Sequence, residues 1–116
     1  MAFFPTDPAT PGHTLIIPRA HVTDLWAAEH ALGAELITAV IRVGRAIQRA
    51  VTPEGMNLIS SSGEAAEQTV FHLHFHVVPR WRRDGFGRIW PPERPMDEAA
   101  KEDLADLVRA AYQEEV

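Results

Sequence analysis

The sequence predicts an α+β domain in which an antiparallel sheet packs against helices. Residues 13–18, 56–61 and 69–79 have strand character, because β-branched and aromatic residues recur there between turn signals. Residues 30–51 instead repeat apolar side chains at the helical period. Because only a short polar loop, residues 62–68, separates the last two strands, we expect that pair to be antiparallel.

The first part of the chain combines a turn-rich loop with a short strand. Residues 5–12 hold three prolines and a glycine and therefore predict a loop. The strand at residues 13–18 (HTLIIP) follows and ends at a proline. Thr23 or Asp24 is typical of a residue that caps a short helical turn.

The helix predicted for residues 30–51 is amphipathic, with one broad apolar stripe. Pro53 and Gly55 follow it and should end it. The stripe consists of Leu36, Val40, Val43, Ile47 and Ala50, widened by Leu32, Ile37 and Ile41.

The end of the chain predicts a second helix after a long loop. The segment from residue 80 to Pro95 is rich in Arg, Gly and Pro, and Asp97 is a good helix cap. Leu104, Leu107, Val108 and Ala111 share one helical face, so we expect this helix to be an added packing element. We expect residues 1–116 to form a single domain, with residues 96–116 as a C-terminal helical extension.

Composition limits the function classes. The chain has 116 residues, the size of one domain, and a formal net charge of −5, which argues against a general nucleic-acid binder. Cysteine is absent, which excludes disulfides and thiol chemistry. No segment approaches the roughly 20 apolar residues of a membrane span. We therefore expect a soluble cytoplasmic protein that binds neither nucleic acid nor membrane.

Basic residues crowd the loop after the third strand, with two interpretations open. The arginines could form a local anion site, or they could belong to an ordinary solvated loop. Trp81 and Phe86 in the same loop could fold over a nearby site. The arginines are Arg80, Arg82, Arg83, Arg88 and Arg94.

Three of the six histidines alternate along the strand predicted for residues 69–79. Because successive strand side chains point to opposite faces, His72, His74 and His76 should project together. The intervening apolar residues, Phe71, Leu73, Phe75 and Val77, should then face a core.

Three interpretations of these histidines remain open on the residues alone. They could be core or surface histidines with satisfied hydrogen bonds. They could bind a metal ion, since neutral imidazole is a common ligand. They could also form an anion site with an imidazole nucleophile, which suits phosphoryl or nucleotidyl transfer. In that case Gln68 and Thr69, just upstream, could supply amide and hydroxyl donors.

The sequence resembles the histidine-triad (HIT) family. The signature His-x-His-x-His-x-x, with x apolar, matches residues 72–78 in full. The match continues upstream through Gly63, Gln68 and Thr69, and residues 11–21 (PGHTLIIPRAH) resemble another family segment. The resemblance covers roughly residues 2–80.

The resemblance implies a nucleotide hydrolase or nucleotidyl transferase that cleaves a bond at an α-phosphorus, without a metal or other cofactor. Nucleoside phosphoramidates and dinucleoside polyphosphates are the implied substrate classes. His74 would be the nucleophile that becomes nucleotidylated, His72 would orient it through its backbone carbonyl, and His76 would contact the phosphate. The implied substrate-binding residues are Gln68, Thr69, His13, which matches a fourth family histidine, and Ser61.

The resemblance also implies a homodimer, with the helix at residues 30–51 at the two-fold interface. Two alternatives remain beside the enzyme: a non-catalytic protein that binds nucleotide phosphate, and a metal-dependent hydrolase.

The sequence departs from the family pattern in two places. The N-terminal segment that family members usually carry before the matched region is not in this sequence. Pro5 stands where relatives usually have Asp or Asn for the ribose, and Ser61 stands where many have Asn. Proline offers no side-chain hydrogen bond, so nucleoside recognition should differ from that of typical members.

Overall fold

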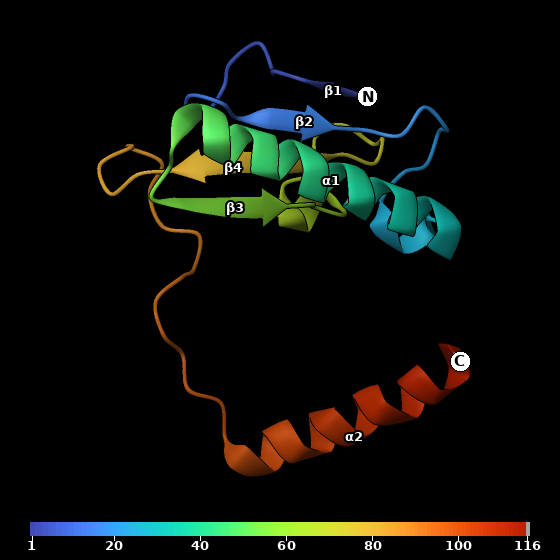
Figure 1. The fold of residues 1–116 in the computed structure, drawn as a ribbon. Helices are drawn as coiled ribbons and strands as arrows, with labels where there is room; N and C mark the ends of the chain where they lie inside the picture. The colour runs from blue at the N-terminus through green and yellow to red at the C-terminus, as the bar shows by residue number, and fades with distance from the viewer. Residues whose placement is uncertain (116) are drawn as a thin grey trace.

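The computed structural model describes residues 1–115 and confirms an α+β fold built on a four-stranded sheet (Figure 1). The strand order is β1-β2-β4-β3, and every neighbouring pair is antiparallel. The strands are β1 (Ala2–Phe3), β2 (Thr14–Ile16), β3 (Gly55–Ile59) and β4 (Phe75–Arg80). The helices are α1 (His30–Val51) and α2 (Glu98–Glu115), with single 3₁₀ turns η1 (Leu25–Ala27) and η2 (Glu64–Ala66).

The long helix α1 has the predicted bounds and covers one face of the sheet. Asp24 caps the preceding η1, because its Oδ1 accepts from the Ala27 N–H at 3.0 Å. Thr52 ends α1 in the left-handed conformation, with φ of 47°. The apolar stripe is only partly buried: Leu36, Val40 and Ile47 are buried, whereas Ile37, Ile41 and Ala50 are exposed.

The core lies between α1 and strands β2 and β4. Ile16 on β2 pairs with Phe75 on β4, and both belong to the buried cluster beneath α1. Because strand side chains alternate, the next pair, Leu15 and His76, lies on the opposite face of the sheet. That face carries no helix, so β4 presents a histidine on an open surface while its alternate residues anchor the core.

The histidine segment is a strand for only part of its predicted length. The expectation of a strand at residues 69–79 was wrong at its start, because β4 begins at Phe75. Leu73, Phe75 and Val77 are buried as predicted, but Phe71 is 48% exposed. The alternation of partly exposed and buried side chains nevertheless runs from His72 to Val77, although only His76 of the three histidines lies within β4.

The arginine-rich loop does not fold over the histidines, which corrects that expectation. Arg80 ends β4, at the opposite end from His76, and the loop continues from there (Figure 1). The Arg80 guanidinium bonds to Asp84 at 2.6 Å and to Asn57 at 2.8 Å, and it lies 4.2 Å from the centre of the Phe86 ring. This ion pair holds the pKa of the Asp84 carboxyl far below its usual range. Arg80 is therefore a structural residue of this loop.

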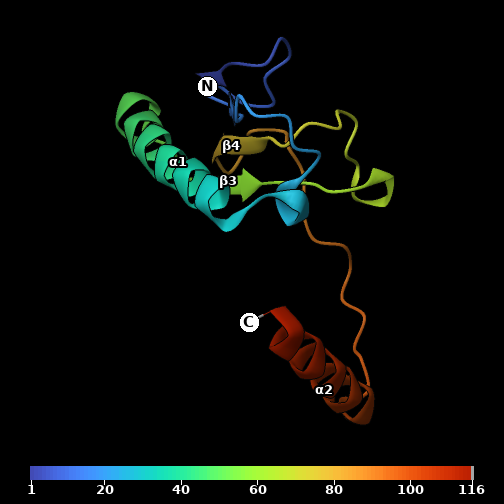
Figure 2. The ribbon, with the colours of Figure 1, turned by 90° about the vertical axis from the view of Figure 1, so that its right-hand side faces the viewer.

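The second helix forms where it was predicted but does not pack as expected. Asp97 accepts from the Ala100 N–H at 3.3 Å, as a helix cap does. No residue of α2 is buried, and Leu104, Leu107 and Val108 are exposed. Figures 1 and 2 show α2 apart from the sheet and α1. Within the described residues, neither helix is long and apolar enough to cross a bilayer.

Candidate active site

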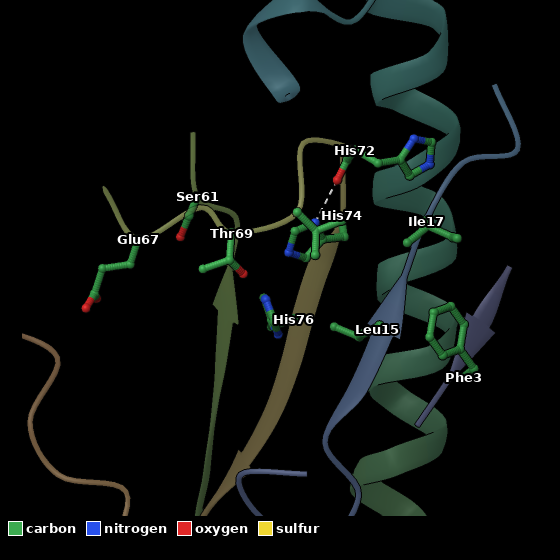
Figure 3. Close-up of a pocket in the computed structure, with 10 residues that line it drawn as sticks. Phe3, Leu15, Ile17, Ser61, Glu67, Thr69, His72, His74 and His76 are labelled. Carbon is green, nitrogen blue, oxygen red and sulfur yellow. Dashed lines mark hydrogen bonds between the residues drawn. The ribbon is translucent and has the colours of Figure 1, made fainter. Parts of the chain in front are cut away.

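The open face of the sheet holds a cavity of about 460 Å³, a size that suits a small ligand. Figure 3 shows apolar side chains on one side of it, polar side chains on the other, and the rings of His74 and His76 between them. Phe3, Leu15 and Ile17 lie on the apolar side, and Ser61, Glu67 and Thr69 lie on the other. The remaining lining residues are Val70, His72, His74 and His76.

A backbone hydrogen bond determines the tautomer of His74. Its Nδ1 lies 2.7 Å from the His72 carbonyl oxygen (Figure 3). Since a carbonyl only accepts, His74 Nδ1 must carry the proton, and Nε2 of the neutral ring keeps its lone pair. Figure 3 shows the free side of this ring directed into the cavity, toward Thr69. The arrangement presents a fixed nucleophilic nitrogen to a ligand.

The His72 ring points away from the His74 ring (Figure 3) and holds its segment in place. His72 Nε2 lies 3.1 Å from the Pro18 carbonyl, and its Nδ1 lies 3.2 Å from His21 Nδ1. The next residue, Leu73, is fully buried and donates its N–H to the Val22 carbonyl. His72 and His74 are thus held rigidly although they precede β4, and His72 turns its carbonyl rather than its ring toward His74.

His76 and His13 form a second hydrogen-bonded pair, which determines where the protons lie. The Ala9 N–H donates to His13 Nδ1 at 3.0 Å, so the neutral His13 ring carries its proton on Nε2. That N–H donates to His76 Nδ1 at 2.9 Å. His76 must then carry its own proton on Nε2. His74 and His76 therefore present complementary atoms: a lone pair on one ring and an N–H donor on the other.

Burial keeps His76 neutral at physiological pH. Desolvation, together with smaller effects of the neighbouring His74 and His13 rings, lowers its pKa to about 4. Desolvation also lowers the pKa of His13. The centre of the His76 ring lies 4.9 Å from that of His74. His76 is therefore a neutral hydrogen-bond donor in the free protein rather than an imidazolium.

A tight turn places His13. Gly12 has φ of +91°, and a Cβ there would lie 3.2 Å from the Pro79 side chain, so only glycine fits without strain. Thr10, buried on the same turn, donates its hydroxyl to the Pro79 carbonyl at 2.6 Å. The loop at residues 5–12 is therefore clamped onto β4, which brings His13 against His76.

Gln68 was predicted to bind substrate, but the structure places its side chain outside the cavity. The residue is 4% exposed, and its Oε1 accepts from the Gly63 N–H at 2.8 Å. Its Nε2 donates to the carbonyls of Thr23 at 2.8 Å and Val70 at 3.1 Å. All the polar atoms of this side chain are occupied by backbone, so Gln68 holds the loop that carries Thr69.

The structure does bring Ser61 and Thr69 to the cavity wall, opposite the apolar side. It also brings Glu67 there, which the sequence reasoning missed. Glu67 follows η2 in the left-handed conformation, with φ of 67°. A non-glycine residue with positive φ is uncommon and often marks a functional position. The feature of the sequence that could have identified Glu67 is an acidic residue two positions before Thr69 and close to the histidines.

The described residues contain no cluster of three or more His, Cys, Asp or Glu side chains arranged to hold a metal ion. Several histidine ring nitrogens already form hydrogen bonds within the protein and are not free to bind a metal ion. His13 Nε2 faces His76 Nδ1, and His74 Nδ1 faces a carbonyl, so these atoms bond within the protein.

Comparisons with known proteins agree with the architecture. The HIT domain family model matches residues 1–83. Protein hit of Bacillus subtilis is 36% identical over 92% of this chain and 73% of its own length. Adenosine 5'-monophosphoramidase hnt1 of Schizosaccharomyces pombe is 32% identical over 78% of this chain and 66% of its own. Adenylylsulfatase HINT3 of Arabidopsis thaliana is 37% identical over 68% of this chain and 40% of its own.

A solved structure of a HIT family protein from Bacillus anthracis matches this fold with a TM-score of 0.85 at 32% identity. The match covers 95% of this chain and 79% of that protein. This chain spans between 60% and 73% of the first three curated relatives.

Proposed function

Because the chain belongs to the HIT domain family, we propose that it is a nucleotide hydrolase or nucleotidyl transferase acting at an α-phosphorus. The main support for this proposal is the tautomer of His74, which has its proton on Nδ1. The His72 carbonyl accepts a hydrogen bond from the His74 Nδ1–H, which keeps the proton on Nδ1 and leaves the Nε2 lone pair free in an open cavity. An activated, oriented imidazole is the group that covalent nucleotidyl transfer requires.

The proposed reaction has two steps. His74 Nε2 attacks the α-phosphorus and forms an N–P bond, while the bond from phosphorus to the leaving nitrogen or oxygen breaks. The leaving group keeps the electron pair of that bond and takes a proton from solvent. Water, or another acceptor hydroxyl, then attacks the nucleotidyl-histidine, loses a proton, and releases the nucleotide and neutral His74.

The neighbouring groups support the transition state by positioning and hydrogen bonding. The His76 Nε2–H is directed by its bond to His13, so it can donate to a phosphoryl oxygen without reorganising. Thr69 and Ser61 place hydroxyl groups on the same side of the cavity. The apolar side, with Phe3, Leu15 and Ile17, suits a nucleoside base. Gln68 acts in this proposal through the loop rather than by contact.

We propose nucleoside phosphoramidates or dinucleoside polyphosphates as the substrate class. The support is the names of two relatives, an adenosine 5'-monophosphoramidase and an adenylylsulfatase, which act on adenylyl compounds with different leaving groups. A cofactor-free reaction and a cytoplasmic location stay predictions.

The test is a substitution of the nucleophile. We expect His74→Asn to lower turnover of an adenosine phosphoramidate by at least about 10³-fold, because no nucleophilic imidazole nitrogen remains to attack phosphorus. Rapid quenching of the wild-type reaction should trap a protein carrying one adenylyl group. His30→Asn is the control, since His30 is exposed at the start of α1. Unchanged turnover in His74→Asn would contradict the mechanism, and tight AMP binding without any turnover would favour a binding protein.

We also propose a homodimer formed along the free edge of β3. β3 is the last strand of the sheet, and its outer edge is unpaired within the described residues. Three apolar side chains of α1 and β3 are 40–49% exposed: Ile37 and Ile41 of α1, and Leu58 of β3. A second copy placed against this edge would cover all three.

A further inference from the structure

The cavity has one feature that the proposed reaction does not use. Glu67 is the only Asp, Glu, Lys or Arg among the ten lining residues. Within residues 1–115, no lysine or arginine forms an ion pair with it. A lone carboxylate beside a phosphoryl site opposes the binding of further negative charge.

The backbone holds Glu67 firmly in this position. Its N–H donates to the Glu64 carbonyl at 2.9 Å, which closes η2. The next residue, Gln68, is buried and tied to three backbone groups. Ser62 ties the start of the same loop to Asp24 at 2.6 Å. The position of Glu67 relative to the histidines is therefore set by the fold, although its side chain is exposed.

The geometry of attack shows which part of a substrate meets Glu67. In phosphoryl transfer the attacking and leaving atoms lie roughly in line through phosphorus. Figure 3 shows the free side of His74 facing Thr69, with Ser61 and Glu67 farther out on that side, and with Leu15, Ile17 and Phe3 on the opposite side of the ring. A phosphorus held in front of His74 therefore directs its leaving group toward Ser61 and Glu67, while the base lies on the apolar side.

We propose that Glu67 is a specificity residue that faces the leaving group and selects against leaving groups that carry negative charge. This inference rests on the proposed function. It favours phosphoramidates of neutral or cationic amines over adenylyl compounds whose leaving group is anionic, such as a phosphate chain. The selection is electrostatic, so it weakens with added salt.

The test compares three adenosine 5'-phosphoramidates of similar size. Their amines are ethylenediamine, which adds a cation, propylamine, which is neutral, and glycine, which adds a carboxylate. For each substrate kcat/KM is measured with the wild-type protein and with Glu67→Gln, which keeps side-chain length and backbone demands. Because intrinsic reactivity of each substrate is the same for both proteins, the ratio between proteins isolates the effect of the carboxylate.

We expect the wild-type preference for the cationic over the anionic substrate to fall by about two- to tenfold in Glu67→Gln, the size typical of exposed charge pairs. Glu67→Lys should reverse the order. Raising the salt concentration tenfold should shrink the wild-type preference and leave that of Glu67→Gln nearly unchanged. Glu64→Gln is the matched control, because Glu64 is exposed on the same turn but does not line the cavity.

The two proposals fail in different ways. If the wild-type protein turns over none of the three phosphoramidates in a way that depends on His74, the proposed function is contradicted. Normal His74-dependent turnover with the same charge order in the wild-type, Glu67→Gln and Glu67→Lys proteins would overturn only the role of Glu67. If Glu67→Gln lowers the thermal midpoint, the salt dependence of the wild-type protein decides the question, since a salt-independent charge order excludes a carboxylate effect.

Discussion

A hydrogen bond from His13 determines the proton position of His76 at the centre of the site. His13 reaches His76 across 63 residues of chain, and the bond between them exists only because the Gly12 turn and β4 are clamped together. The pair gives His76 one fixed donor and removes the choice between tautomers. The cost is that both rings are desolvated and resist protonation.

This cost predicts a stability loss in acid. The pKa of folded His76 is about 4, below the ordinary 6.5, so the unfolded chain binds the extra proton first as pH falls. Stability from His76 is therefore complete above about pH 6.5 and is lost as pH falls toward 4. Because the ring keeps part of its solvation, we expect a loss of about 1–2 kcal/mol over this window.

The measurement is urea unfolding at pH 7 and pH 4.5. His76→Gln should lose less stability than the wild-type protein between these two values, because it has no ring to protonate. His30→Gln, at an exposed position, should behave like the wild-type protein. An identical pH dependence in His76→Gln and the wild-type protein would show that His76 is not the group responsible.

At the scale of elements, the site is made by irregular segments attached to a small sheet. β4 supplies only His76, while His72 and His74 precede it and Ser61, Glu67 and Thr69 lie on the loop around η2. Such loops need anchors, because their backbone groups are not paired by a ladder. Gln68 is the anchor here, and it connects this loop to the carbonyl of Thr23.

Removing that anchor should destabilise the protein. Gln68→Ala removes a buried side chain and leaves the Gly63 N–H and the carbonyls of Thr23 and Val70 without their partner at part-buried positions. We expect a loss of about 2–4 kcal/mol in the free energy of unfolding, measured with urea. Gln113→Ala, on exposed α2, is the matched control and should change stability by less than about 0.5 kcal/mol.

The same substitution separates an anchor from a ligand. If Gln68 touched substrate, Gln68→Ala would raise KM and leave stability unchanged. We expect instead that Gln68→Ala lowers the free energy of unfolding. Any loss of activity should be partly restored when the substrate concentration or the temperature is adjusted to keep the protein folded. A fully stable Gln68→Ala protein would contradict the anchoring role.

At the scale of the whole molecule, the sheet-and-helix body and α2 differ in charge and packing. Residues 1–96 hold equal numbers of acidic and basic residues, so the net charge of −5 lies on residues 97–116. α2 buries none of its residues, and the body leaves Ile37, Ile41 and Leu58 exposed. Exposed apolar side chains beside a free strand edge are typical of an interface.

The dimer proposal predicts a mass of twice 12.9 kDa in solution, measured by light scattering or sedimentation. Ile41→Glu should shift the protein toward monomer, because it places a charge on the surface that a second copy would cover. Ala65→Glu adds the same charge on the exposed η2 and should leave the mass unchanged. A monomer at all concentrations, or an Ile41→Glu dimer as stable as the wild type, would exclude this interface.

The sequence by itself determined the fold class, the bounds of α1, the end of the chain as a helix, and the family. These follow from local patterns: helical periodicity over residues 30–51, the Asp97 cap, and a histidine spacing that needs no tertiary information to read. Alternation also identified Leu73, Phe75 and Val77 as core residues correctly.

Only the tertiary structure decided what each site residue does with its polar atoms. His72 turns its ring to Pro18 and His21, Gln68 binds backbone rather than the cavity, and Arg80 pairs with Asp84 at the far end of β4. The positive φ of Glu67 likewise depends on how η2 closes. The physical reason is that these hydrogen bonds join segments far apart in the chain. Residue spacing alone cannot tell whether a polar side chain will meet a ligand or a backbone group.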